Sequence, residues 1–317
     1  MDHSKGFRVM SQFNAPHFQS HEAARAYLEA IRWGAERVCQ HCGTVGKSYA
    51  NAKKPGVYRC ASKECRKDFT VTTKSVMESS HIKLHIWLQA FYMMASSKKG
   101  VSSHQLHRAL GVTYKTAWFL THRIREAMRA GGLLAPLGAG GKVVEVDETF
   151  YGFLEGQPKT GRRAWSNKNV VLTLVERGGS ARSFHVDGVR VGDLMPIIRE
   201  NLSREAQLMT DEANAYKFIA ETDGLDHSTV THSKDEYVRY DGEKMISTNT
   251  VEGYYSIFKR GMKGVYQHCS EKHLHRYLAE FDFRYSNRVA LGIGDGERAD
   301  LAVKGAAGKR LTYRQAN

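Results

Sequence analysis

The chain has 317 residues, of which 41% are hydrophobic and 25% are charged. These fractions are typical of a globular protein of roughly two domains, and they exclude a largely disordered chain and a small disulfide-stapled protein. Lysine and arginine number 47 against 33 aspartates and glutamates, which gives a formal net charge of +14. A positive field of this size attracts polyanions, so nucleic acid is the first partner to consider.

The first residues, 1–6, lack the apolar core of a signal peptide, and the apolar run 170–175 is far too short to span a membrane. We therefore expect a cytoplasmic protein. The apolar pattern predicts a helix over 21–33 with Ser20 as its N-cap, and further helices within 83–128. Glycine and proline, which interrupt helices and strands, are concentrated over 131–141 and predict a linker and the main domain boundary.

Beyond the linker, short strands are followed by alternating helices and strands, which predicts a mixed α/β domain with helices packed on a sheet. Strands are expected over 142–151, 170–176, 181–186 and 206–210, and helices over 193–201, 249–262 and 271–287. The tail after residue 291 is rich in glycine, alanine and basic residues, and this composition predicts partial disorder.

Four cysteines have the spacing of a metal site: Cys39 and Cys42 form a C-x2-C pair, and after 17 intervening residues Cys60 and Cys65 form a C-x4-C pair. Two cysteine turns joined across a hairpin supply four thiolates, the tetrahedral set that structural zinc prefers. A redox motif would not need the second pair. His41 is an alternative ligand, and the basic rim of this hairpin is either a DNA contact or a solvated surface.

The segment 101–128 predicts a helix, a turn at Gly111 and a second helix, which is typical of a helix-turn-helix. In such motifs the first residues of the second helix reach base edges, while basic residues hold phosphates. A helical hairpin that only packs against a neighbour is the alternative. The expected base-contacting residues are Thr113, Tyr114, Lys115 and Thr116, and the expected phosphate contacts are Arg123, Arg125 and Arg129.

Acidic residues recur at the positions where a sheet would bring them together. Asp147 alternates with valines in the middle of a predicted strand, where a carboxylate is expensive to bury unless a cation pairs with it. Asp211 ends another strand, at an edge where ligands collect in open sheets. Glu252 and Lys259 share one face of a predicted helix. Their combination in this order predicts a divalent-metal site.

The motifs VEVDETFYG, LMTDEANAY and NTVEGYYSIFKRGMKGVY resemble those of DDE transposases from bacterial insertion sequences, specifically the ISXO-like group related to Merlin elements. The resemblance implies an RNase H-like catalytic domain in which Asp147, Asp211 and Glu252 bind two Mg²⁺ or Mn²⁺ ions. It makes Lys259 the companion basic residue and leaves Asn249 as a rival third ligand. Such a protein would cleave and join double-stranded DNA at terminal inverted repeats and target sites, as a homo-oligomer associated with the nucleoid.

One residue departs from this family pattern, because Tyr255 stands where many relatives carry tryptophan. Glu145 and Glu148 flank the predicted site as possible substitute ligands. The expected modules are a helical segment, a zinc ribbon, a helix-turn-helix region, a glycine-rich linker, the catalytic domain and a basic flexible tail, over 1–35, 36–75, 76–132, 133–142, 143–290 and 291–317 respectively.

Two other functions share these features. A zinc-ribbon DNA-binding regulator would carry an inactive RNase H-like domain, and its distinguishing feature would be a missing acid. A metal-dependent nuclease or resolvase would use the same metal site to cut DNA without joining it.

Overall fold

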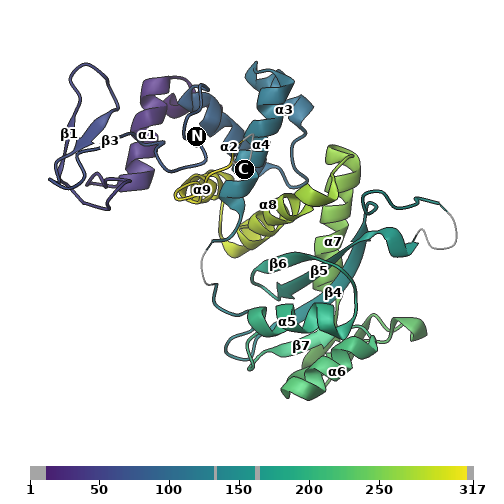
Figure 1. Cartoon of the computed structure of the whole chain (residues 1–317). Helices are drawn as coiled ribbons and strands as arrows, with labels where there is room; N and C mark the ends of the chain where they lie inside the picture. The colour runs from purple at the N-terminus through teal and green to yellow at the C-terminus, as the bar shows by residue number, and fades with distance from the viewer. Residues whose placement is uncertain (1–11, 132–133, 161–164, 313–317) are drawn as a thin grey trace, which may run out of the picture. The chain divides into compact units, whose positions relative to one another are not determined.

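The computed structural model describes residues 12–131, 134–160 and 165–312 (Figure 1). The chain divides into two compact units. The first comprises Met1–Ser96, Ser103–Ala127 and Asp295–Asn317, and the second comprises Ser97–Ser102 and Met128–Gly294. Among the described residues, no helix has the length and apolar character needed to cross a bilayer.

The first unit begins with helix α1 (His21–Trp33), as the sequence predicted. The Ser20 hydroxyl accepts a hydrogen bond from the Ala23 backbone N–H at 3.1 Å and so caps the helix. A small antiparallel sheet follows, formed by β1 (Ser48–Ala50), β2 (Tyr58–Cys60) and β3 (Asp68–Phe69) in that order.

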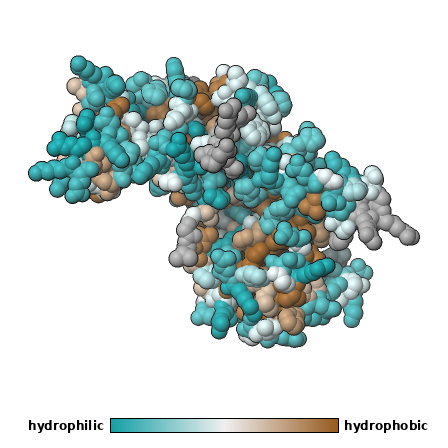
Figure 2. Space-filling model, viewed as in Figure 1, coloured by the Kyte–Doolittle hydropathy of each residue, from teal (hydrophilic) through white to brown (hydrophobic). Residues whose placement is uncertain are grey.

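Four further helices complete the described part of the first unit: α2 (Leu84–Ser96), α3 (Ser103–Leu110), α4 (Tyr114–Met128) and α9 (Asp295–Lys304). Helices α3 and α4 form the expected helix, turn and helix. Helix α9 packs against α2 and α1 and buries Ala299, Ala302 and Val303. The prediction of a flexible tail is therefore wrong over this helix, because its small apolar residues form a packed side. Hydrophilic residues cover most of the face of this unit that Figure 2 shows.

The second unit is built on a five-stranded sheet in the order β6-β5-β4-β7-β8. The strands are β4 (Val143–Tyr151), β5 (Asn169–Glu176), β6 (Ala181–Val186), β7 (Gln207–Thr210) and β8 (Asp226–Thr229). The first three strands pair antiparallel, whereas β7 pairs parallel with both β4 and β8. This order and these directions are those of an RNase H-like sheet, and the predicted fold class is confirmed.

Helices cover both faces of this sheet, and alternate residues of β5 enter different layers. Leu172 and Leu174 pack in a core with side chains of α5 (Val191–Asn201) and α6 (Asn214–Asp223). Val171 and Val175 pack instead against α7 (Asn249–Gly261) and α8 (Leu274–Ser286). Both faces of β5 are therefore covered, and every residue of the strand except the last is buried.

The sequence analysis did not predict strand β8 or the hairpin of β9 (Val238–Asp241) and β10 (Lys244–Ser247) in the second unit. All four residues of β9 are exposed, so no alternation of apolar and polar residues marked the strand. Helix α7 continues into a π-helical turn, Met262–Tyr266. Short 3₁₀ helices span Gln12–Asn14, Pro16–Phe18, Trp165–Asn167, His232–Lys234, Glu271–His273 and Val289–Leu291.

Candidate active site and zinc-binding cluster

The four predicted cysteines converge in the first unit, where their sulfur atoms all lie within 4.8 Å of one another. The Sγ atoms of Cys39 and Cys65 are 3.8 Å apart, and those of Cys42 and Cys60 are 3.7 Å apart. Four thiols at these distances fit a structural Zn²⁺. The Nε2 atom of His41 lies 3.0 Å from the backbone oxygen of Asp68, so this histidine contacts β3 rather than the cluster.

The residues expected to read DNA lie at the start of α4. Tyr114 is 45% exposed and its ring stacks on His104, with a centroid distance of 4.3 Å. Lys115 is also exposed. Thr113 caps the helix, since its hydroxyl accepts a hydrogen bond from the Thr116 backbone N–H at 3.2 Å. These side chains are accessible, and their contact with DNA stays a prediction.

Two of the three arginines expected to hold phosphates have internal roles instead. Arg125 is only 1% exposed and donates a hydrogen bond to the Thr121 hydroxyl, so the prediction for this residue is wrong. Arg123 is half-buried and donates to the backbone oxygens of Glu78 and Leu311. The count of basic residues on a helix does not reveal which of them face the core. Arg129 is exposed.

Three elements of the second unit carry the predicted catalytic acids. Asp147 lies on β4, Asp211 follows the last residue of β7, and Glu252 lies in the first turn of α7. Strands β4 and β7 are parallel neighbours in which Glu145 is level with Met209. Two residues further along both strands, the same register brings Asp147 level with Asp211. Parallel pairing thus explains why an acid within one strand meets an acid at the end of the next.

The three acids share one electrostatic environment. Burial raises the pKa of Asp147 to about 7, together with the negative charges of Asp211 and Glu252, while His232 opposes this shift. Burial, with Asp147 and Asp211, also raises the pKa of Glu148 to about 7. Carboxylates that raise each other's pKa are a natural site for a cation, and an all-oxygen donor set suits Mg²⁺ or Mn²⁺. Among the residues that the structure describes, only the four cysteines have ligand atoms close enough together to bind a single metal ion. The carboxylate oxygens of the three acids lie further apart than that.

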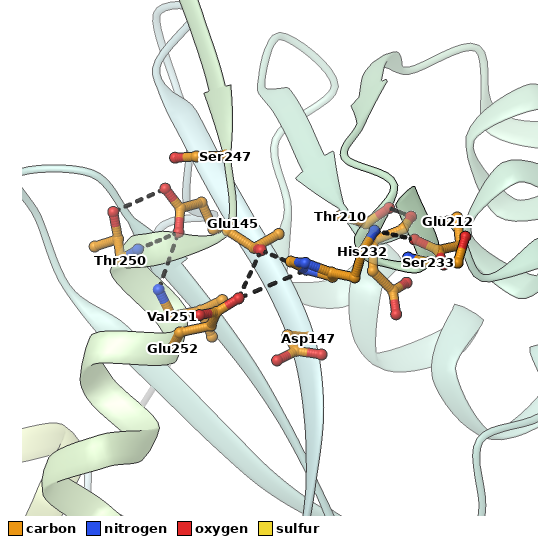
Figure 3. Close-up of polar contacts among 12 residues, drawn as sticks. Glu145, Asp147, Thr210, Glu212, His232, Ser233, Ser247, Thr250, Val251 and Glu252 are labelled. Carbon is orange, nitrogen blue, oxygen red and sulfur yellow. Dashed lines mark hydrogen bonds and ion pairs between the residues drawn. The ribbon is translucent and has the colours of Figure 1, made fainter. Parts of the chain in front are cut away.

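Glu145 does not act as a ligand in this arrangement, because its carboxylate is fully engaged elsewhere. The side chain is completely buried and accepts hydrogen bonds from the backbone N–H groups of Thr250 and Val251, at 2.7 and 2.9 Å (Figure 3). Arg177 donates to the same carboxylate at 2.6 Å and also to the backbone oxygens of Met245 and Ser247. Glu145 therefore caps the helix that carries Glu252.

The structure adds His232 to the site, a residue that the sequence analysis did not single out. Its Nε2 atom is 3.2 Å from the Thr248 hydroxyl and 3.6 Å from Oε1 of Glu252 (Figure 3). The backbone N–H groups of His232 and Ser233 donate to the two carboxylate oxygens of Glu212, at 2.7 and 3.1 Å. No local pattern marks this histidine, because its partners are brought to it by the fold.

The remaining predicted residues lie along α7. Lys259 is exposed, with its Nζ atom 6.0 Å from the centre of the Tyr255 ring. The Tyr255 hydroxyl donates to the backbone oxygen of Asp147 at 2.5 Å and lies 3.1 Å from that of Val171, so it links α7 to strands β4 and β5. A tyrosine at this position keeps a polar link to the strand of Asp147. Asn249 is exposed at the first position of the helix, and its rivalry with Glu252 stays open.

A four-cysteine ribbon and an RNase H-like sheet with acids on neighbouring elements are the architecture of DDE-class transposases. Residues 138–286 match the model of the ISXO2-like transposase domain, and residues 19–68 match that of the transposase zinc-ribbon domain. The chain is 27% identical over 284 residues to an uncharacterized protein in transposable element ISH50 of Halobacterium salinarum, covering 84% of this chain and 91% of that protein. Residues 138–286 thus carry an ISXO2-like transposase domain, and residues 19–68 carry a transposase zinc ribbon.

Proposed function

We propose that this protein is the transposase of a DNA insertion sequence, which binds the element's ends and catalyses DNA cleavage and strand transfer. The proposal rests on the positions of Asp147 on β4, Asp211 directly after β7 and Glu252 in the first turn of α7, where the charges of Asp211 and Glu252 both act on Asp147. The two transposase domain matches support the same function.

Asp147, Asp211 and Glu252 would hold the Mg²⁺ or Mn²⁺ ions. The ions would supply activation of the attacking water or DNA 3′-hydroxyl and stabilisation of the leaving oxygen in an in-line displacement at phosphorus. Lys259 would contact the phosphate beside the scissile bond. It stands seven positions after Glu252 in α7, so both side chains belong to one helix face.

The first unit would supply DNA binding. Its zinc-binding ribbon and the exposed start of α4, with Tyr114 and Lys115, offer aromatic and cationic contacts for a duplex. We infer that the protein acts as a homo-oligomer on paired element ends and on target DNA, in the cytoplasm with the nucleoid.

The test is cleavage and joining of a duplex that carries the DNA flanking the gene, in Mg²⁺ or Mn²⁺, with Asp147→Asn as the matched variant. We expect metal-dependent nicking at the ends and a joined product, both lost in Asp147→Asn while DNA binding remains. Nicking without joining would instead identify a nuclease or resolvase. Tight binding without cleavage in either metal would identify a DNA-binding regulator.

A further inference from the structure

We propose that Glu212, His232 and Thr248 form a positioning relay that orients the carboxylate of Glu252 for metal binding. The inference rests on the proposed function in one respect, the assignment of Glu252 as a metal ligand. None of the three relay residues is needed as a ligand itself. They act through Glu252, so they are positioning residues rather than catalytic ones.

The direction of the hydrogen bonds defines the relay. The Thr248 hydroxyl donates to Oε1 of Glu252 at 3.2 Å, so the proton of this hydroxyl is already used. The Thr248 hydroxyl oxygen lies 3.2 Å from Nε2 of His232 and therefore accepts a hydrogen bond from the Nε2–H group. The order is thus His232 to Thr248 to Glu252. The other ring nitrogen, Nδ1, is buried and has no partner among the described residues, so the ring makes its side-chain hydrogen bond through Nε2.

Glu212 anchors this relay at its far end. Both of its carboxylate oxygens accept backbone N–H groups, one from His232 and one from Ser233, which fixes the turn that presents the imidazole (Figure 3). Glu212 directly follows Asp211 in the chain. Of these two adjacent acids, Asp211 is a proposed metal ligand, whereas Glu212 holds the turn that carries His232.

The helix cap fixes the backbone of α7 but does not orient the Glu252 side chain. Glu145 fixes the backbone at the start of α7, but the Glu252 side chain is 44% exposed and is free to adopt several rotamers unless something holds it. The buried Thr248 hydroxyl holds one of its oxygens and leaves the other available. Residues that orient a metal ligand in this way typically affect metal affinity about 10–100-fold.

The test measures Mn²⁺ binding to the full-length protein by electron paramagnetic resonance, which needs no DNA and no turnover. Thr248→Val removes the hydroxyl but keeps the side-chain volume, and Thr248→Ser is the matched control that keeps the hydroxyl. We expect Thr248→Val and His232→Ala to weaken Mn²⁺ binding about 10-fold or more, and Thr248→Ser to bind within about twofold of the wild type. His232→Gln, whose amide can donate near the position of Nε2, should recover part of the loss.

Wild-type affinity in both Thr248→Val and His232→Ala would overturn the relay while leaving the metal site in place. If His232→Ala fails to fold, the comparison of Thr248→Val with Thr248→Ser decides, because equal affinities in that pair also overturn the relay. A wild-type protein that binds no Mn²⁺, or binds it unchanged in Asp147→Asn, would overturn the proposed metal centre itself.

Discussion

The carboxylate of Glu145 on strand β4 accepts hydrogen bonds from the backbone N–H groups of Thr250 and Val251 at the start of helix α7. Glu145 lies two residues before Asp147, and Thr250 lies two residues before Glu252. One buried contact therefore fixes the distance between two of the proposed metal ligands. The site depends on acids that bind backbone groups as well as on acids that would bind metal.

Glu145→Gln should destabilise the second unit, because an amide cannot match the charge of Arg177 or accept all the donors that face it. Loss of such a buried, hydrogen-bonded charge costs about 2–4 kcal/mol of unfolding free energy. Urea unfolding measures this loss, and Glu243→Gln on the exposed hairpin is the control that should change nothing. Equal stability of the two variants would show that the cap is dispensable.

Elemental analysis should find one zinc per chain in the first unit. Cys60→Ser should lose the metal and unfold the ribbon, since a structural site with a missing thiolate cannot hold zinc tightly. Cys269→Ser is the matched control, because this cysteine lies outside the four-cysteine cluster. Zinc retained in Cys60→Ser and lost in Cys269→Ser would contradict the assignment.

Glu252→Gln should abolish metal-dependent cleavage while DNA binding remains nearly intact, because it removes a ligand charge and leaves the DNA-binding unit unchanged. Asn249→Ala is the comparison, since its side chain is the rival third ligand at the first position of the same helix. The measurement is nicking of end DNA in Mg²⁺ and in Mn²⁺. An active Glu252→Gln beside an inactive Asn249→Ala would assign the third position to Asn249.

Lys115→Ala should weaken DNA binding and reduce the slope of log affinity against log salt by about 1, as expected for the loss of one phosphate contact. Arg125→Met should instead lower stability, because Arg125 is buried and bonded to Thr121. Fluorescence anisotropy at several salt concentrations separates the two effects. A reduced salt slope in Arg125→Met would show that this side chain reaches DNA after all.

Local patterns in the sequence predicted most of the elements that carry the site. Helix 21–33 and strand 181–186 have the predicted bounds, and the helix has both a regular apolar face and a clear N-cap. The hairpin β9–β10 and helix α9 were missed, since one is exposed and the other has the composition of a flexible tail. The ordered acids were visible in the sequence, but their division into proposed ligands and anchors was not.

That division depends on contacts between distant segments. Glu145 and Thr250 are 105 residues apart in the chain, and Glu212 and His232 are 20 residues apart. An acid that caps a distant helix and an acid that binds a metal look the same in a sequence. Burial and hydrogen-bond partners distinguish them, and both require the tertiary structure.

Asp282 gives the second unit a pH-dependent stability that is independent of any metal. Its carboxylate accepts hydrogen bonds from the hydroxyls of Tyr254 and Ser183, and from the Ser183 backbone N–H, at 2.6 to 2.8 Å. Burial raises its pKa to about 6 although these bonds and the charge of Arg182 oppose the shift. His275 of the same helix α8 lines the cavity beside it.

Because the pKa of Asp282 in the folded protein is higher than in the unfolded chain, folding favours the protonated acid. Its contribution to stability is therefore complete below about pH 4 and is lost as the pH rises through about 6, for a total of about 3 kcal/mol. Asp282→Asn cannot titrate, so the unfolding free energy of the wild type minus that of Asp282→Asn should fall by about 2 kcal/mol between pH 4.5 and 7.5. Urea unfolding of both proteins at each pH measures this difference and cancels the titration of every other group. A difference that stays constant, or rises with pH, would mean that burial does not raise the pKa of this carboxyl.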